Sequence, residues 1–122
     1  MIRPYQIELV EPGIMRIAWD GVVNRENFTQ GILDRKQFAD DHQLSRYVLI
    51  FDLRKAQVVV FDVRLAAWSA NADPRMTHTL IIGKSSIVFL TVNAMLRLTK
   101  LQVRFVNSDD EALEHAREIV KV

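Results

Sequence analysis

The sequence predicts a single α/β sandwich, with a mixed sheet of about five strands, an N-terminal β-hairpin and about four helices. Three observations lead to this class. Short apolar runs of strand length alternate with longer amphipathic segments, turn residues separate the two kinds, and 122 residues suffice for one domain but are few for two. The expected order of elements is ββαβαβαβα, with residues 1–122 forming one domain.

The N-terminal hairpin is predicted from two strand-like segments on either side of a turn. Residues 5–10 carry apolar side chains at every second position, which is the period of a half-buried strand. A Glu-Pro-Gly turn follows at 11–13, and residues 14–20 are interpreted as the returning strand. Gly21 is expected to end that strand.

The first helix is predicted to begin after Asn24, a residue type that caps helix N-termini well, and to run to about Asp41. Phe28, Ile32 and Ala39 fall on one stripe of this segment. Such a stripe is the buried face of an amphipathic helix that packs on a sheet.

Two short apolar runs predict the buried strands of the sheet. Residues 47–51 are continuously apolar up to Asp52, which is typical of a central parallel strand covered on both faces. Residues 80–82 form a second buried strand. Between them a helix is expected over residues 62–72, ended by the Asp-Pro pair at 73–74.

The C-terminal part is predicted to hold two helices and one strand. Ser85 and Ser86 offer N-caps for a helix that runs to about Lys100. Residues 102–106 alternate again, which favours a strand nearer the edge of the sheet. Ser-Asp-Asp-Glu at 108–111 is a capping box. The helix that follows is expected to bury three apolar side chains, namely Leu113, Ala116 and Val120.

Composition argues against several classes of protein. The 16 basic and 15 acidic residues give a net charge of +1, whereas a nucleic-acid-binding domain usually has a basic excess. The absence of cysteine excludes disulfides and thiolate metal sites, and it suits a cytoplasmic protein. The most apolar stretch, residues 87–98, is interrupted by polar side chains, so no transmembrane segment is expected. Residues 1–5 lack the long apolar core of a secretory signal, so no such signal is expected.

Several short stretches resemble one known group of proteins. They are the strand that ends at Asp52-Leu53, the Ile-Ala-Trp-Asp-Gly stretch at 17–21, and the final strand that leads into Ser-Asp-Asp-Glu-Ala at 108–112. Together with the order of elements, they are similar to the SpoIIAA-like proteins, bacterial relatives of the STAS domain of anti-sigma-factor antagonists. The resemblance covers nearly the whole chain. It implies contact with a regulatory partner, or an apolar ligand, since this group is also similar in fold to the CRAL-TRIO lipid-transfer domains.

The resemblance also implies a regulatory position that this sequence does not preserve. Classical STAS antagonists carry a phosphorylatable serine where the segment after the central strand enters the next helix. No serine or threonine occurs between Asp52 and Asp62, and Ser69 lies too far into the helix. We therefore expect no phosphoacceptor there. Asp62 is interpreted as a helix N-cap, with a permanent negative charge as the alternative.

No catalytic constellation is recognisable in the sequence. None of the serines lies in a Gly-x-Ser-x-Gly turn, and the three histidines, His42, His78 and His115, are scattered singly rather than at metal-ligand spacing. No enzyme activity, cofactor or metal is therefore expected. An enzyme would require Asp52, His78 or the turn at 84–86 to meet in one pocket.

A candidate anion site lies where two neighbouring strands are expected to end. Lys84, Ser85 and Ser86 stand between a strand and a helix, whose free amides could hold an anion. Arg54 and Lys55 follow the neighbouring strand and are expected at the same edge of the sheet. The alternative is an ordinary strand end with no ligand.

Large apolar side chains interrupt the polar stripes of the two central helices. In the helix expected up to Lys100, the polar stripe is formed by Asn93, Arg97 and Lys100. Phe89 and Leu90 fall on the same stripe, four and three residues before Asn93.

Trp68 interrupts the polar stripe of the helix over 62–72 in the same way, between Arg64 and Asn71. Right-handed crossovers would place both helices on one face of the sheet, where Trp68, Phe89 and Leu90 could converge with Met76. The alternative is that the helices are rotated and these residues belong to the core.

The function predicted first is a non-enzymatic, STAS-like binding or regulatory domain. In this hypothesis the surface of Trp68, Phe89, Leu90 and Met76 contacts a protein partner or a second copy of the chain. The alternative is a carrier that holds a small apolar or lipid-like ligand under the helices at 62–72 and 86–100.

Overall fold

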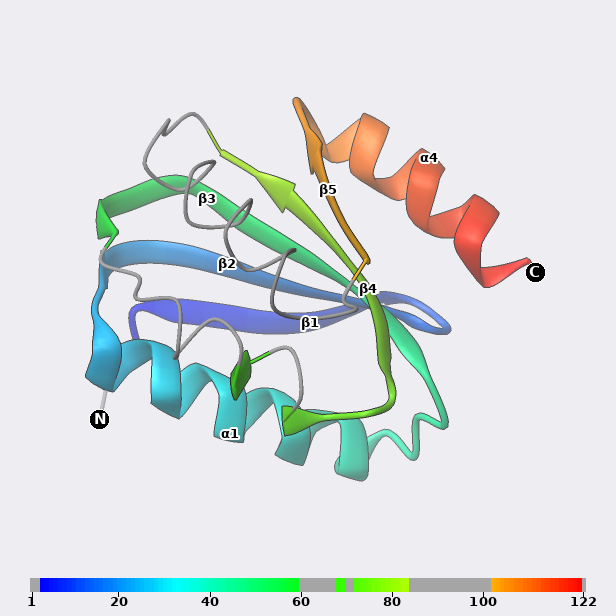
Figure 1. Ribbon diagram of the computed structural model, residues 1–122, viewed down its shortest axis with the longest axis horizontal. Helices are drawn as coiled ribbons and strands as arrows, with labels where there is room; N and C mark the ends of the chain where they lie inside the picture. The colour runs from blue at the N-terminus through cyan, green and yellow to red at the C-terminus, as the bar shows by residue number, and fades with distance from the viewer. Residues whose placement is uncertain (1–2, 60–67, 70–71, 84–101, 122) are drawn as a thin grey trace.

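The computed structural model describes residues 3–59, 68–69, 72–83 and 102–121. These residues form two α-helices and five strands (Figure 1). In chain order the elements are β1 (Tyr5–Glu11), β2 (Ile14–Val23), α1 (Arg25–Asp41), β3 (Tyr47–Val59), β4 (Met76–Ile82), β5 (Gln102–Val106) and α4 (Asp109–Val120). The helix predicted over 62–72 lies largely outside the described residues, and the helix predicted up to Lys100 lies wholly outside them.

The five strands form one mixed sheet in the order β1-β2-β3-β4-β5. β1 and β2 are antiparallel neighbours, with Tyr5 opposite Trp19, and so make the predicted hairpin. All other neighbours are parallel. Asp52 of β3 stands between Ala18 of β2 and Ile82 of β4 in this register. The prediction of a mixed five-stranded sheet with an N-terminal hairpin is confirmed.

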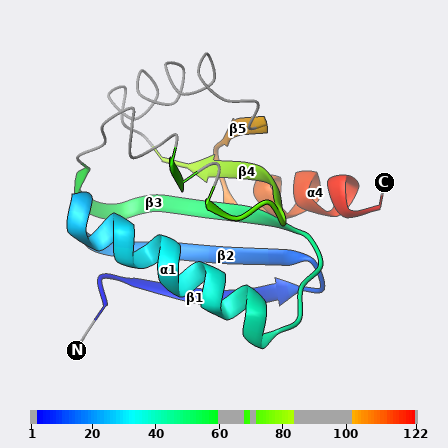
Figure 2. The same cartoon turned by 60° about the horizontal axis from the view of Figure 1, so that its bottom comes forward.

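Helices α1 and α4 cover opposite faces of the sheet (Figure 2). Along β3 the alternation assigns Leu49 and Phe51 to the α1 face, and Val48 and Ile50 to the α4 face. Both faces of β3 are therefore apolar, as the continuous run at 47–51 predicts for a central strand.

The α1 face holds the larger aromatic side chains. Trp19 is fully buried, with its ring 4.8 Å from that of Tyr5 and 6.3 Å from that of Phe28. Helix α1 approaches this ring at Gly31, where an added Cβ would lie 3.2 Å from Trp19 Cζ2. The missing side chain at Gly31 thus lets the helix pack closely on the tryptophan.

Three strand boundaries differ from the predictions by more than one residue. β2 continues through Gly21 to Val23, and β3 continues beyond Asp52 to Val59, because the two extensions pair with each other. The charge of Asp52 does not end β3, since Arg16 and Arg54 bind the carboxylate. β4 begins at Met76, because the residues before the apolar run at 80–82 also join the ladder.

The helix ends follow the sequence signals, with one correction. The Asn24 side chain caps α1, and Ser108 Oγ accepts a hydrogen bond from the Glu111 N–H, 3.1 Å away. Glu111 bonds the N–H of Asn107. Helix α4 buries Ala116 and half-buries Leu113, but Val120 is exposed because it stands at the last residue of the helix.

We expect Ser108→Ala to lower the free energy of unfolding by about 1 kcal/mol, because the first turn of α4 loses its side-chain acceptor. Urea denaturation followed by circular dichroism measures the loss. Ser45→Ala, in an exposed turn, is the matched control and should change little. Equal effects of the two substitutions would contradict the capping role.

Candidate functional site

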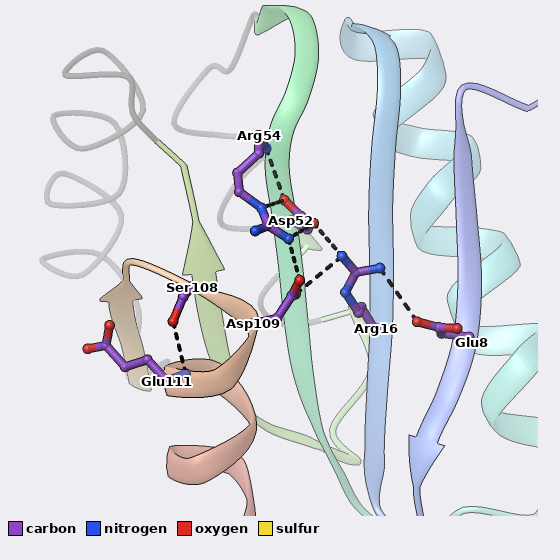
Figure 3. A network of polar contacts seen from close by, with 7 residues as sticks. All are labelled: Glu8, Arg16, Asp52, Arg54, Ser108, Asp109 and Glu111. Atoms are coloured by element: carbon purple, nitrogen blue, oxygen red, sulfur yellow. Dashed lines mark hydrogen bonds and ion pairs between the residues drawn. The ribbon is translucent and has the colours of Figure 1, made fainter.

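A network of charged side chains lies on the α4 face of the sheet, where the predicted end of β3 meets the start of α4. We call Arg16, Asp52, Arg54 and Asp109 the sheet-edge network (Figure 3). Arg16 extends from β2, Asp52 and Arg54 from β3, and Asp109 from the first turn of α4. Side chains from three elements that are far apart in sequence thus connect two strands and a helix.

The contacts of Arg54 define the geometry of this network. Its Nε lies 3.0 Å from Asp52 Oδ1, and its Nη2 lies 2.9 Å from Asp52 Oδ2 and 2.6 Å from Asp109 Oδ2. Arg16 Nη2 also bonds Asp52 and lies 3.3 Å from Asp109 Oδ1. Each arginine therefore bridges Asp52 on the sheet and Asp109 on the helix, and Arg16 Nη1 also lies 3.5 Å from Glu8 Oε1 of β1.

A β-bulge helps to gather these side chains. Ala18 pairs with Asp52, but Asp20 pairs with Lys55, so that Leu53 and Arg54 together stand opposite a single residue of β2. A bulge of this kind changes the alternation of the strand and turns side chains toward a different face. Lys55 consequently lines the same surface hollow as Arg54.

The electrostatics of the network favour the ionised carboxylate. Burial of Asp52 opposes ionisation, but the hydrogen bonds from Arg54 and the positive charges of Arg54 and Arg16 outweigh it, so the pKa of Asp52 lies below its usual value. Hydrogen bonds to Asp52 and Asp109 raise the pKa of Arg54. The network is a mutually satisfied set of ion pairs.

A shallow hollow of about 820 Å³ lies beside the network, over β1, β2 and β3. Gln6 and Ala18 line it together with the charged side chains of Arg16, Asp52 and Lys55. Both charge signs are present, because Arg3 and Arg54 also line this hollow, as do Asp20 and Asp109. This mixture is typical of a solvated sheet face.

The structure places the residues of the predicted anion site in different settings. Arg54 already binds two carboxylates, and Lys55 lines the 820 Å³ hollow. Lys84, Ser85 and Ser86 lie outside the described residues. The anion site therefore stays a prediction, and its one described arginine is engaged in the sheet-edge network.

A second network, around Asp73, lies on the other face, at the beginning of β3 and β4. The buried Asp73 carboxylate accepts hydrogen bonds from Tyr47 Oη at 2.8 Å and from Arg75 Nε at 2.8 Å. Arg75 Nη1 also lies 2.7 Å from Asp40 near the end of α1. Arg75 thus ties α1 to the turn before β4, as Arg54 ties α4 to β3.

The pKa of Asp73 is lowered in the fold, whereas that of its partner Tyr47 is raised. Burial opposes ionisation of Asp73, but the bonds from Arg75 and Tyr47 outweigh it and keep the pKa of this carboxyl below its usual value. Burial raises the pKa of the Tyr47 phenol, and its bond to Asp73 adds to the shift. The neighbouring charge of Arg35 acts against that rise.

The predicted apolar surface is described only in part. Trp68 is 44% exposed, whereas Met76 is buried and packs in the core on the α1 face. Met76 therefore adds nothing to an exposed surface, because it begins β4 in the interior of the sheet. Phe89 and Leu90 lie outside the described residues.

The backbone beside Trp68 is held by a buried side chain that the sequence did not single out. Arg35 of α1 is almost fully buried, and its Nη2 donates a hydrogen bond to the Ser69 carbonyl oxygen, 3.2 Å away. The sequence feature that could have identified Arg35 is its position on the buried stripe between Ile32 and Ala39, because a charge on a buried helix face requires a partner.

The residues named for an enzyme do not all meet. His78 pairs with Val48 and Asp52 with Ile82, so four residues of β3, about 13 Å, separate the two positions along the sheet. Among the described residues, no three His, Cys, Asp or Glu side chains gather as a metal site would require. Within the same residues, no helix is long and apolar enough to cross a membrane.

Comparison with known proteins establishes the fold. No family model and no curated protein matches the chain. A structure of an uncharacterised protein of the DUF3478 family from Shewanella loihica PV-4, described as having a SpoIIAA-like fold, is similar with a TM-score of 0.62 and 14% identity, over 92% of this chain and 91% of that one. The unphosphorylated anti-sigma factor antagonist SpoIIAA is similar with a TM-score of 0.56 and 14% identity, over 96% and 97%. The chain therefore has a SpoIIAA-like fold.

Proposed function

From a SpoIIAA-like fold as the premise, we propose that this domain is a non-enzymatic binding module that contacts proteins through a surface around Trp68. A second copy of the chain is one such partner, since symmetric dimers are the commonest assemblies of soluble proteins. The observation that carries the proposal is the exposure of Trp68, at 44%, beside a backbone held by a buried arginine.

The support under Trp68 favours a binding role. Ser69 accepts the hydrogen bond of Arg35, and the Arg35 charge lies close to the Tyr47–Asp73 pair in the interior. A tryptophan beside an anchored backbone loses less conformational freedom on binding than one in an unsupported loop. Tryptophan is also among the residues that most often dominate the energy of protein interfaces.

The description of one structural neighbour supports a role in protein binding. SpoIIAA is described as an anti-sigma factor antagonist, which is a role directed at another protein. The segment between Asp52 and Asp62 of the present chain contains no serine or threonine. We therefore propose that binding here operates without a phosphorylation switch at that segment.

Sedimentation velocity over a range of protein concentrations tests the proposal. We expect the wild-type chain to associate as its concentration rises, and Trp68→Ala to weaken the association by about tenfold or more, the effect of losing an interface hot spot. Leu33→Ala is the matched control, since Leu33 is 49% exposed on α1 and should leave association unchanged.

Two results would count against this function. A wild-type chain that stays monomeric at every concentration contradicts self-association, and a Trp68→Ala chain that associates like the wild type removes Trp68 from the interface. Native mass spectrometry of freshly purified protein adds a further check. A retained apolar molecule of constant mass would favour the carrier of a lipid-like ligand instead.

A further inference from the structure

A second, smaller hollow lies on the α4 face, where β3 and β4 begin. It is therefore at the other end of these strands from the sheet-edge network. Its volume is about 150 Å³. It lies between the β1–β2 turn, the beginnings of β3 and β4, and the last turn of α4, and it is lined among others by Gly13, Val48, Thr77, His78, Ile119 and Val120. Its walls are mostly apolar, and Arg46, Thr77 and His78 supply polar side chains.

A β-bulge brings these two polar side chains together. Tyr47 pairs with Met76, but the next residue of β3, Val48, pairs with His78, so Thr77 is an extra residue in β4. Bulges re-aim side chains and recur beside functional sites. Here Thr77 and His78 line the same hollow although they are adjacent in sequence.

The hydrogen bonds at the bulge favour a proton on Nδ1 of His78. Thr77 Oγ1 donates to the Tyr47 carbonyl oxygen, 3.3 Å away, and lies 2.9 Å from His78 Nδ1. A hydroxyl has one proton, so Thr77 accepts from an N–H at Nδ1. In a neutral ring, Nε2 then has an unprotonated lone pair. Within the described part of the chain, no side chain or backbone group bonds this nitrogen.

We propose that this hollow is a binding site for a small apolar molecule with one hydroxyl group, of the size of a phenol. The hydroxyl donates a hydrogen bond to His78 Nε2, and the ring of the ligand packs on Val48, Ile119 and Val120. The volume supports this size, because a protein cavity of about 150 Å³ holds a benzene molecule. The site is separate from the Trp68 surface, so it adds a ligand to the proposed binding module.

Nuclear magnetic resonance titration with two probes of similar shape tests this site. Phenol carries the hydroxyl donor, whereas methoxybenzene has an ether oxygen that cannot donate. At about pH 8, where imidazole is ordinarily neutral, we expect phenol to shift the His78 ring resonances and the Val120 methyl resonances in a saturable way. The affinity for methoxybenzene should be lower by a factor of about ten or more, because methoxybenzene cannot donate a hydrogen bond to Nε2.

Thr77→Val tests the orienting role of the hydroxyl. Valine has the shape of threonine but cannot accept from Nδ1, so we expect the ring nitrogens of His78 to lose their single tautomer and phenol to bind more weakly. His42→Asn, at an exposed histidine that stacks on Phe38 of α1, is the control and should leave both unchanged.

Three results would overturn the proposal. They are equal binding of phenol and methoxybenzene, phenol shifts that do not saturate, and saturable shifts confined to residues away from His78 and Val120. If Thr77→Val does not fold, the comparison of the two probes on the wild-type chain decides alone.

Discussion

Replacing Asp73 by alanine is expected to lower the free energy of unfolding by about 3–5 kcal/mol, the range for removing one partner of a buried charge pair. The carboxylate is 1% exposed and accepts hydrogen bonds from Tyr47, from the Arg75 side chain and from the Arg75 backbone N–H. Without it the buried phenol of Tyr47 loses its acceptor and Arg75 loses its inner partner. Equilibrium urea denaturation measures the change.

Asp40→Ala is the matched control for Asp73. The same arginine, Arg75, binds both carboxylates, but that of Asp40 is 61% exposed. An exposed ion pair contributes less than about 1 kcal/mol, because water and salt screen it. Losses of similar size for the two substitutions would contradict the role given to burial at Asp73.

Asp52→Asn is expected to cost about 2–3 kcal/mol, somewhat less than the loss at Asp73, because its two arginines are partly exposed. The substitution keeps the shape of the side chain but leaves Arg16 and Arg54 without their shared buried charge. Asp109→Asn is the control, since its carboxylate is 54% exposed while that of Asp52 is 9% exposed. We expect Asp109→Asn to cost less than about 1 kcal/mol by the same urea measurement.

The same carboxylates predict how stability depends on pH. The pKa values of Asp52 and Asp73 in the folded chain lie below 3.8, the usual value. A group with a lowered folded-state pKa stabilises the fold above its unfolded pKa, and this stabilisation is lost as pH falls through the folded pKa. Asp52→Asn should therefore show a smaller loss of stability between about pH 5 and pH 2 than the wild type does.

The local parts of the fold could be predicted from the sequence. The hairpin, the Asn24 cap, the stripe of Phe28 and Ile32, and the alternation of β5 all follow from residues that are close together in the chain. Capping by Ser108 is local as well, because its partner is three residues away. Short-range patterns such as these need no knowledge of the tertiary structure.

The two charge networks could not be predicted in this way. Arg16 and Asp52 are 36 positions apart, and Arg54 and Asp109 are 55 positions apart. In the sequence Asp52 indicates the end of a strand, because an isolated carboxylate is costly inside a sheet. The arginines that offset this cost come from other elements, and only the register of the strands brings them together.

The sequence also did not reveal two of the register shifts in the sheet, each of which affects a surface hollow. Thr77 is an extra residue of β4 with no pairing partner in β3. Leu53 and Arg54 of β3 together stand opposite a single residue of β2. No glycine or other turn residue marks either bulge in the sequence. The exposure of Trp68 could be proposed from its place on a polar stripe, whereas its support by Arg35 depends on a contact across 34 positions.

The most direct test of the binding surface is fluorine NMR of the chain labelled with fluorotryptophan. The sequence has two tryptophans, of which Trp19 is buried in the core and Trp68 is exposed, so Trp19 is an internal control. We predict that the Trp68 resonance responds to exchange of water for heavy water in dilute solution and loses this response as the protein concentration rises, while that of Trp19 stays constant. A Trp68 resonance that keeps its full response to heavy water at every protein concentration would contradict the proposed interface between copies of the chain.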